Sequence, residues 1–324
     1  MQHQQGFSEL EHSNKRKLTR REKFLALMEE VVPWGELLQA LKPFYPKGER
    51  GRPPIGLERM LRVYFLQQWY GLADEALEDA LYDIPAFREF AGINLSSDPV
   101  PDATTVLKFR HLLEKHDLCS SIFETINHYL EANGMMMREG TIVDASIINA
   151  PVSTKNKDKA RDPEMNHAKK GNQYYFGMKA HIGVDRDTGM VHTVVSTPAK
   201  VADIVETVNL LHGQEEEVGA DAGYLGVEKR KEIQEFDPEG KIKWSIAKRK
   251  SSIKKIEDPQ EREAVRIEES KKASVRAFVE HPFHIIKNLF QYRKTRYRGI
   301  KKNHGQLQVL FGLQNLVKLS RTMP

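Results

Sequence analysis

Three carboxylates stand at positions where they could take part in chemistry. Asp144 lies in the middle of the alternating segment TIVDASII, and Asp221 closes the segment EVGAD just before a glycine turn. Glu280 is a single acid among bases in RAFVEHPFHIIKNLF, residues 276–290. If Asp144 and Asp221 come close together in the fold, they repel each other unless a cation lies between them.

Each carboxylate also has an ordinary structural interpretation. Asp144 can be a buried aspartate that backbone or hydroxyl donors satisfy, and Asp221 can be a turn residue. Glu280 can form an i,i+4 pair with Arg276 on a solvated helix face, which is worth about 0.2–0.5 kcal/mol. The residues themselves leave these alternatives open.

The segment around Glu280 is predicted to be one regular helix. At about 100° per residue, five polar side chains fall within roughly 40° of one line: Arg276, Glu280, His284, Lys287 and Gln291. The opposite side is expected to face the core with Val275, Phe278, Ile285, Ile286 and Leu289.

The strands that would position the two aspartates begin after residue 138. TIVDASII alternates with period two, and YYFGMKAHIGV and MVHTVVST, joined by DRDTG, predict a hairpin. A helix at about 201–212, the strand EVGADAG, the helix GVEKRKEIQEF and the strand KIKWSIA follow. This order predicts a mixed α/β sheet, antiparallel at its start and parallel afterwards, with the first and fourth strands side by side. Asp144 and Asp221 would then be neighbours, and the polar stretch STKNKDKARDPEMNHAKKGN is expected to be a mobile loop.

The first 135 residues show helical periodicity and no convincing strand. LERMLRVYFLQQWY is predicted to form an amphipathic helix that ends at Gly71, and ADEALEDALYD starts the next one. PDATTVLKFRHLLEKH is predicted to start at a cap such as Asp102 and to expose Lys108, Arg110 and His111. Such a helix could enter a DNA groove, although ordinary helical bundles contain many like it.

Positive charge is concentrated near the ends of the chain. The formal net charge is +5, yet residues 281–324 contain no acid and nine basic residues: Lys287, Arg293, Lys294, Arg296, Arg298, Lys301, Lys302, Lys318 and Arg321. KRKLTRREK at 15–23 is a second basic cluster, and YPKGERGRPPIG at 45–56 is expected to be an exposed basic turn. Clustered charge with Tyr292 and Tyr297 between the bases favours a nucleic-acid partner over a membrane surface.

Composition excludes several classes of protein. The single cysteine, Cys119, excludes an internal disulfide and a thiolate metal cluster. No run of about 18 apolar residues and no apolar leader are present, so we expect a cytoplasmic protein without a membrane span. The length suggests two domains, at 1–135 and 136–324.

Several motifs in order along the chain resemble one family of proteins. VDAS at 143–146, GADAGY at 219–224 and the set Arg276, Glu280 and Lys287 are similar to the motifs of bacterial insertion-sequence transposases of the DDE type. The likeness is to the family named for the fifth insertion sequence. It extends through PFYPK, FRHLLEKH, APVSTKNK, RDPEM, KKGNQ, FGMKAHIGVD and EHPFHIIK.

The resemblance implies a ribonuclease-H-like catalytic domain with a basic helical tail, preceded by an all-helical domain for DNA binding or oligomerisation. It implies that Asp144, Asp221 and Glu280 hold Mg²⁺ or Mn²⁺, cations that prefer oxygen ligands. Two metal ions are expected, because two such ions together can catalyse in-line displacement at phosphorus. Arg276 and Lys287 would contact DNA phosphate. Lys179 and His181, which share a strand face, are candidates for places near the site, and a structural role fits them equally well.

The expected activity is binding of the element's terminal inverted repeats, strand cleavage and transfer to target double-stranded DNA. Because two ends are held together, we expect at least a homodimer on DNA. The alternatives are an inactive DNA-binding repressor or decayed copy, and a nuclease without strand transfer. One departure is Ala273, where the wider signature has a tyrosine, so a role of that tyrosine in cleavage does not carry over.

Overall fold

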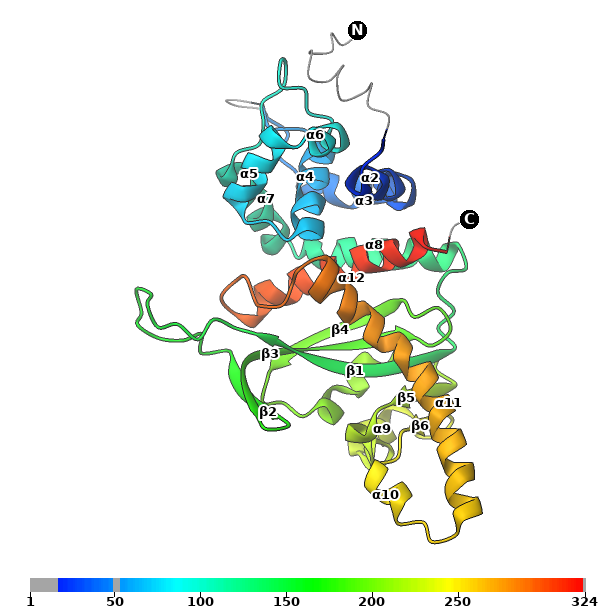
Figure 1. Ribbon diagram of the computed structural model, residues 1–324. Coiled ribbons are helices and arrows are strands. Elements are labelled where there is room, and N and C mark those ends of the chain that lie inside the picture. The colour runs from blue at the N-terminus through cyan, green and yellow to red at the C-terminus, as the bar shows by residue number, and fades with distance from the viewer. Residues whose placement is uncertain (1–16, 49–52, 323–324) are drawn as a thin grey trace. The chain divides into compact units, whose positions relative to one another are not determined.

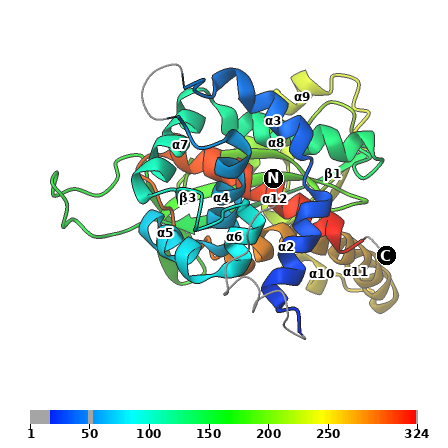
Figure 2. The ribbon, with the colours of Figure 1, turned by 90° about the horizontal axis from the view of Figure 1, so that it is seen from above.

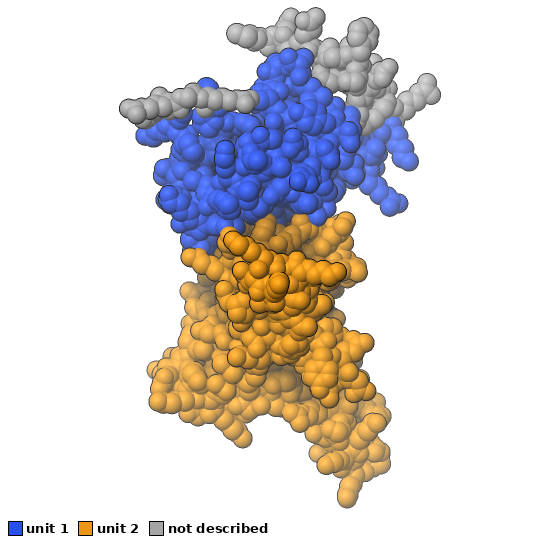
Figure 3. All heavy atoms as spheres, turned by 90° about the vertical axis from the view of Figure 1, so that its left-hand side faces the viewer, with its two compact units in different colours: residues 1–126, 316–324 blue, residues 127–315 orange. Residues whose placement is uncertain are grey.

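The computed structural model describes residues 17–48 and 53–322. The chain divides into two compact units, shown in separate colours in Figure 3. The helical unit comprises residues 1–126 and 316–324, and the sheet unit comprises residues 127–315. Lys15 and Arg16 of the first basic cluster, and residues 49–52 of the expected basic turn, lie outside the described residues.

The helical unit is built around α4, Leu57–Tyr70. Figures 1 and 2 show α4 amid its neighbours α3 (Trp34–Leu41), α5 (Asp74–Asp83), α6 (Pro85–Ala91) and α7 (Ala103–Lys115). α4 is buried on most sides and ends at Gly71, whose left-handed backbone (φ +63°) suits glycine. α2 (Arg20–Val31), a 3₁₀ turn at Lys42–Phe44 and α8 (Leu118–Ala132) complete this part of the chain. Between residues 17 and 139, leaving out 49–52, no strand occurs, as the sequence predicts.

α7 confirms its predicted cap and corrects one predicted surface residue. The Asp102 carboxylate accepts a hydrogen bond from the Thr105 amide at 2.6 Å. Lys108 is exposed, as expected. Arg110, however, is only 8% exposed and makes two hydrogen bonds to the Asp74 carboxylate, at 2.7 and 2.9 Å. The helix wheel could not show that α5 would bring a carboxylate to this position.

The sheet unit contains a mixed sheet in the order β2–β3–β1–β5–β6, with β4 also paired to β3. The strands are β1 (Gly140–Asn149), β2 (Asn166–Lys170), β3 (Gln173–Asp185), β4 (Val191–Pro198), β5 (Glu217–Ala220) and β6 (Lys243–Ile246). β3 runs antiparallel to β1, β2 and β4, whereas β1, β5 and β6 are parallel. The predicted mixed α/β sheet and the adjacency of the first strand and EVGADAG are confirmed.

Two predictions about the sheet unit were wrong. Residues 166–170, expected to be part of a loop, form the edge strand β2, because their backbone pairs with the first half of β3. The helix expected at about 201–212 is replaced by two 3₁₀ turns, Asp203–Glu206 and Val208–Leu210. This segment is rich in β-branched residues, which disfavour a long helix, and the buried Thr207 hydroxyl bonds back to the Ile204 carbonyl.

The remaining connections of the sheet unit are short and helical. They are 3₁₀ turns at Ala222–Tyr224 and Val227–Lys229, and the helices α9 (Lys231–Phe236) and α10 (Lys250–Lys254). α11, Pro259–His284, starts at Asp258, which accepts from the Gln260 amide, and packs against β1 and β5. Figure 1 shows α11 running past β5 and β6.

The helix that carries Glu280 is not regular to its end. α11 stops at His284, and Ile285–Leu289 form a π-helical turn with wider spacing than an α-helix. The five polar residues therefore do not share one line, since Lys287 lies in the π turn and Gln291 has a positive φ of 58°. Ile285 and Ile286 are buried as predicted, but Phe278 and Leu289 are exposed.

The segment after the π turn joins the sheet unit and leads into α12, Ile300–Ser320. The backbone at Lys294 bridges to Asn149 of β1. Tyr292 is 1% exposed and donates its hydroxyl hydrogen to Asn303, so this ring between the bases of the sequence packs inside the sheet unit. None of the described helices combines the length and the apolar character that crossing a membrane requires.

Candidate active site

The parallel pair of β1 and β5 brings Asp144 and Asp221 to the same place. Ile142 pairs with Gly219, and the same register continued by two residues sets Asp144 beside Asp221. Asp144 is in mid-strand, whereas Asp221 follows the last residue of β5. Both therefore lie where β5 ends, at the kind of strand carboxyl end that forms ligand crevices in open sheets.

Asp144 has an unusual electrostatic environment. Burial raises the pKa of its carboxyl to about 6, although the backbone amide of Ala145 acts in the opposite direction. The negative charges of Asp221 and Asp203 raise this pKa further, and Arg276 of α11 lowers it. Burial and neighbouring carboxylates therefore disfavour the ionised form of Asp144 more than its nearby donors and Arg276 favour it.

A tight turn fixes the side chain of Asp221. Its Oδ1 atom accepts a hydrogen bond from the Gly223 amide at 2.7 Å, which caps the 3₁₀ turn Ala222–Tyr224. A Cβ atom at Gly223 would lie 2.8 Å from Asp221 Oδ1. The glycine is therefore needed for the turn to approach the carboxylate this closely.

Glu280 is not brought to the two aspartates in this structure. Its side chain is 67% exposed, and its carboxylate lies 3.9 Å from the guanidinium of Arg276. Over residues 17–48 and 53–322, no group of three or more His, Cys, Asp or Glu side chains is placed so that it could hold a metal ion. The structure therefore joins two of the three predicted acids and leaves the third on the adjoining helix surface.

Lys287 is bound to the strand of Asp144. Its Nζ atom donates to Ser146 Oγ at 2.5 Å and to the Ile147 carbonyl at 3.0 Å. Burial lowers the pKa of this ammonium, Lys170 lowers it further, and Asp144 raises it. Lys287 thus ties the π turn to β1, a contact that the sequence did not reveal, while its predicted contact with phosphate stays a prediction.

A second polar group adjoins the aspartates and includes both site-adjacent candidates from the sequence. Lys179 Nζ lies 2.8 Å from Asp203 Oδ1, and His181 Nδ1 lies 3.8 Å from the same oxygen. His181 is fully buried, its Nε2 lies 2.8 Å from Thr197 Oγ1, and burial lowers its pKa to about 4. Sequence reasoning missed Asp203, because it belongs to the segment that was predicted to be a regular helix.

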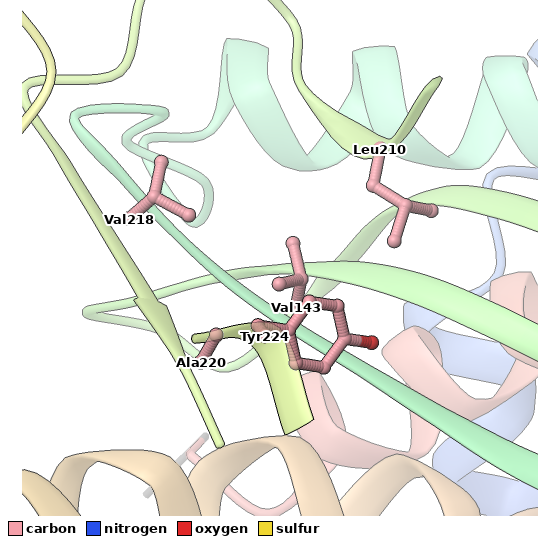
Figure 4. Packing of buried hydrophobic residues seen from close by; sticks show 5 residues of the cluster. All are labelled: Val143, Leu210, Val218, Ala220 and Tyr224. Atoms are coloured by element: carbon pink, nitrogen blue, oxygen red, sulfur yellow. The ribbon is translucent and has the colours of Figure 1, made fainter. Parts of the chain in front are cut away.

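Tyr224 is the other residue that sequence reasoning did not single out. It packs with Val143, Val218 and Ala220, and Figure 4 shows its hydroxyl directed away from Ala220. The residue is 1% exposed, and within the described chain its hydroxyl has no hydrogen-bond partner. Burial raises its pKa, and the charges of Asp203, Asp144 and Asp221 raise it further. Its place in GADAGY, three residues after Asp221, was the available signal.

The predicted DNA-contacting residues near the C-terminus are mostly at the surface. Arg293 and Lys294 are exposed, and Arg296 is half-buried. Arg298 pairs with Asp158 at 2.6 Å, so its charge is already matched in the structure. Their contacts with DNA stay predictions, and so does that of Lys108.

Two family models match the chain in non-overlapping regions. The model described as "Transposase domain (DUF772)" matches residues 12–112, and the model described as "Transposase DDE domain" matches residues 136–316. The second match alone covers more than half of the 324 residues and includes all three predicted acids. No solved structure matches the chain.

Proposed function

The chain belongs to the transposases with a DDE domain, and from this membership we propose that it binds the ends of its own insertion sequence, cleaves phosphodiester bonds there and transfers the strands to target DNA. Its sheet unit, with a mixed sheet and α11 packed on it, is proposed to be ribonuclease-H-like. The substrates are the terminal repeats of the element and a target duplex. At least two copies of the chain act together, because two ends have to be joined in one event.

The observation that carries this proposal is the pair of aspartates on neighbouring parallel strands. Burial and the charge of Asp221 raise the pKa of the Asp144 carboxyl, and the charge of Asp203 raises it further. A protein that only binds DNA gains nothing from a half-buried carboxylate whose charge the fold disfavours close to a polyanion. Groups with strongly shifted pKa values cluster at functional sites, which supports a catalytic centre here.

The donor atoms fit Mg²⁺ or Mn²⁺. They are carboxylate oxygens without a thiolate or an imidazole among them, and their excess negative charge would be relieved by divalent cations. Asp144, Asp221 and Glu280 would hold the ions, two in number. When bound, they supply Lewis acidity that activates a water or a DNA 3′-hydroxyl and stabilises the leaving oxygen.

The chain's own residues supply position and charge. β1 and β5 fix Asp144 and Asp221 relative to each other, and Lys287 holds the end of the π turn on β1. Glu280 lies on α11 one turn beyond Arg276, and its exposed side chain has the freedom to change rotamer towards the site. The positive charge of Arg276 lies close enough to lower the pKa of Asp144, so this side chain is suited to hold a DNA phosphate beside the carboxylates.

A second candidate function is that of a DNA-binding protein without catalysis. It is favoured by the exposed position of Glu280, which leaves only two of the three acids together. Such a protein would bind the element's ends and repress or occupy them.

One experiment tests both functions. The purified full-length chain is mixed with DNA that carries the flanks of its own gene and with Mg²⁺, and nicks and strand-transfer products are mapped to the nucleotide. We expect cleavage at the element ends, lost in Asp144→Asn, Asp221→Asn and Glu280→Gln while end binding persists. Retained cleavage in one variant removes that residue from the triad. Binding without any nick supports the repressor, and nicks without joined products support a nuclease.

A further inference from the structure

The tip of the β2–β3 hairpin is exposed and carries lysines and an aromatic ring. The two strands are joined at Gly171 and Asn172, and Gly171 has a φ of +61°, which suits a two-residue hairpin turn. Tyr174 is 72% exposed, more than any other large hydrophobic residue in the described chain. Lys169 pairs with Tyr174 across the hairpin and holds its ammonium 5.6 Å from the ring centroid.

The acids next to this hairpin in the sequence are engaged elsewhere. Asp158 pairs with Arg298, and the carboxylates of Asp162 and Glu164 accept hydrogen bonds from the Gly299 and Ile300 amides at the start of α12. In the parts of the chain that the structure describes, no carboxylate forms an ion pair with Lys169 or Lys170. The positive charge at the tip is therefore available to an external anion.

The hairpin also lies on the side of the sheet that bears the catalytic aspartate. Side chains alternate along β3, so Tyr174 shares a face with Ala180, and Ala180 pairs with Ser146 two residues from Asp144. Lys170 is close enough to lower the pKa of Lys287, whose ammonium is bound to Ser146. Figure 1 shows β2 along β3, away from β5 and β6. By the same alternation Lys170 lies on the opposite face of the hairpin from Lys169 and Tyr174, so the two lysines place positive charge on both faces of the tip.

We propose that the β2–β3 hairpin binds the DNA strand that enters the site, with Lys169 and Lys170 on its phosphates and Tyr174 stacked on a base that is unpaired beside the cut. Exposed aromatic rings among lysines are the usual platform for unpaired bases, and lysine contacts with phosphate give a salt-dependent affinity. This inference rests on the proposed function, since it assigns a surface to the same reaction.

The test uses the full-length chain in Ca²⁺ with end DNA in which 2-aminopurine replaces a base next to the mapped cut. Affinity is measured across a salt series, with duplex probes and with probes unpaired at that base. Tyr174→Ala should weaken binding to the unpaired probe by about 5- to 150-fold and restore 2-aminopurine fluorescence, while Tyr174→Phe keeps both values. Lys170→Ala should flatten the slope of log K against log salt by about one.

A matched control is Lys241→Ala, an exposed lysine just before β6 at the other edge of the sheet. It should leave the fluorescence unchanged. The stacking assignment is overturned if Tyr174→Ala binds like wild type or loses the same factor on both probes. The phosphate assignment is overturned if Lys170→Ala and Lys241→Ala change the slope equally. If wild type cleaves ends and the hairpin variants do so equally well, only the hairpin inference fails, whereas a wild type that neither binds nor cleaves ends refutes the proposed function.

Discussion

Asp144 and Asp185 are two enclosed aspartates on neighbouring strands, β1 and β3, and their surroundings are opposite in kind. Asp185 is fully buried, and its carboxylate accepts from the amides of Met137, Arg138, Asp187 and Thr188 and from the Thr188 hydroxyl, at 2.7–3.1 Å. Burial alone would raise its pKa, but these hydrogen bonds outweigh burial, and the pKa is lowered. At Asp144 burial prevails, and the pKa is raised to about 6.

The difference separates a carboxylate whose charge the protein satisfies from one whose charge the fold disfavours. Asp185 closes the β3–β4 turn and has its oxygens saturated by the protein. At Asp144 the Ala145 amide and the charge of Arg276 do not outweigh burial and the charges of Asp221 and Asp203, so its ionised form costs the protein stability when no cation is present. Four measurements test this contrast.

The largest expected effect is on stability at Asp185. Asp185→Ala leaves several buried amides without an acceptor, so we expect the free energy of unfolding to fall by about 4 kcal/mol. Urea unfolding followed by circular dichroism measures it. The control is Asp187→Ala in the same turn, an exposed side chain whose loss should cost less than about 0.5 kcal/mol. Equal losses in both variants would mean that Asp185 is not the anchor of this turn.

The second effect is a pH dependence with opposite signs at the two aspartates. The folded-state pKa of Asp144 is about 6 against an ordinary 3.8, so the metal-free folded state binds its proton more tightly and loses stability as pH rises from about 4 to 6. We expect wild type to lose about 2.4 kcal/mol relative to Asp144→Asn between pH 4 and pH 7, because a pKa change of one unit is worth about 1.4 kcal/mol and part of the loss lies below pH 4. Asp185, with its lowered pKa, stabilises above pH 4 and loses this contribution as pH falls below it. The free energies of unfolding of wild type and Asp144→Asn are measured at pH 4 and pH 7. If they differ by the same amount at both pH values, the prediction for Asp144 is wrong.

The third effect is stabilisation by a divalent cation. An ion that binds only the folded state at 100 times its dissociation constant adds about 2.7 kcal/mol, so Mn²⁺ should raise the melting temperature of wild type. Asp144→Asn should lose most of this increase, and Asp187→Ala should keep it. Calorimetry with and without Mn²⁺ measures the change. An equal increase in all three proteins would place the bound ion elsewhere.

The smallest effect is expected at Glu280. Its exposed carboxylate is only loosely paired with Arg276, so Glu280→Gln should change the free energy of unfolding by no more than a few tenths of a kcal/mol. Urea unfolding of wild type and variant measures this, and a loss above about 1 kcal/mol would mean that Glu280 is packed into the fold. If Glu280→Gln is as stable as wild type but no longer cleaves element ends, the loss of cleavage reflects catalysis and not unfolding.

The sequence predicted those parts of the fold that depend on local pattern. Alternation identified β1, the β3–β4 hairpin and β6, and Gly71 and Asp102 marked helix boundaries. The adjacency of Asp144 and Asp221 followed from strand order alone. The predictions that were wrong depended on features that no local pattern contains. These are the ion pair of Asp74 with Arg110, the pairing of the edge strand β2 with β3, and the 3₁₀ turns around Asp203.

The candidate site was predictable in its residues but not in its geometry. An ideal helix wheel placed Lys287 on the same helix face as Glu280. In the structure Lys287 lies in the π turn and donates a hydrogen bond to Ser146 of β1. The helix wheel had no means of detecting such a change in spacing. The motif GADAGY pointed to Tyr224, but the surroundings of its hydroxyl could not be predicted, because they depend on three charges that converge only in the folded chain.

The bond from Lys287 to Ser146 joins residues 141 positions apart, and it also bears on the order in which the molecule assembles. The antiparallel pairs of β1, β3 and β4 close short loops, whereas the β1–β5 pair and the Lys287 contact close long ones, whose entropy cost is greater. On a growing chain the contacts between α11 and β1 can form only after the strands β1 to β6 have been made. A polypeptide that stops before Lys287 can pair β1 with β3 and β3 with β4, but it lacks the contact that fixes the end of the Glu280 helix against the strand of Asp144.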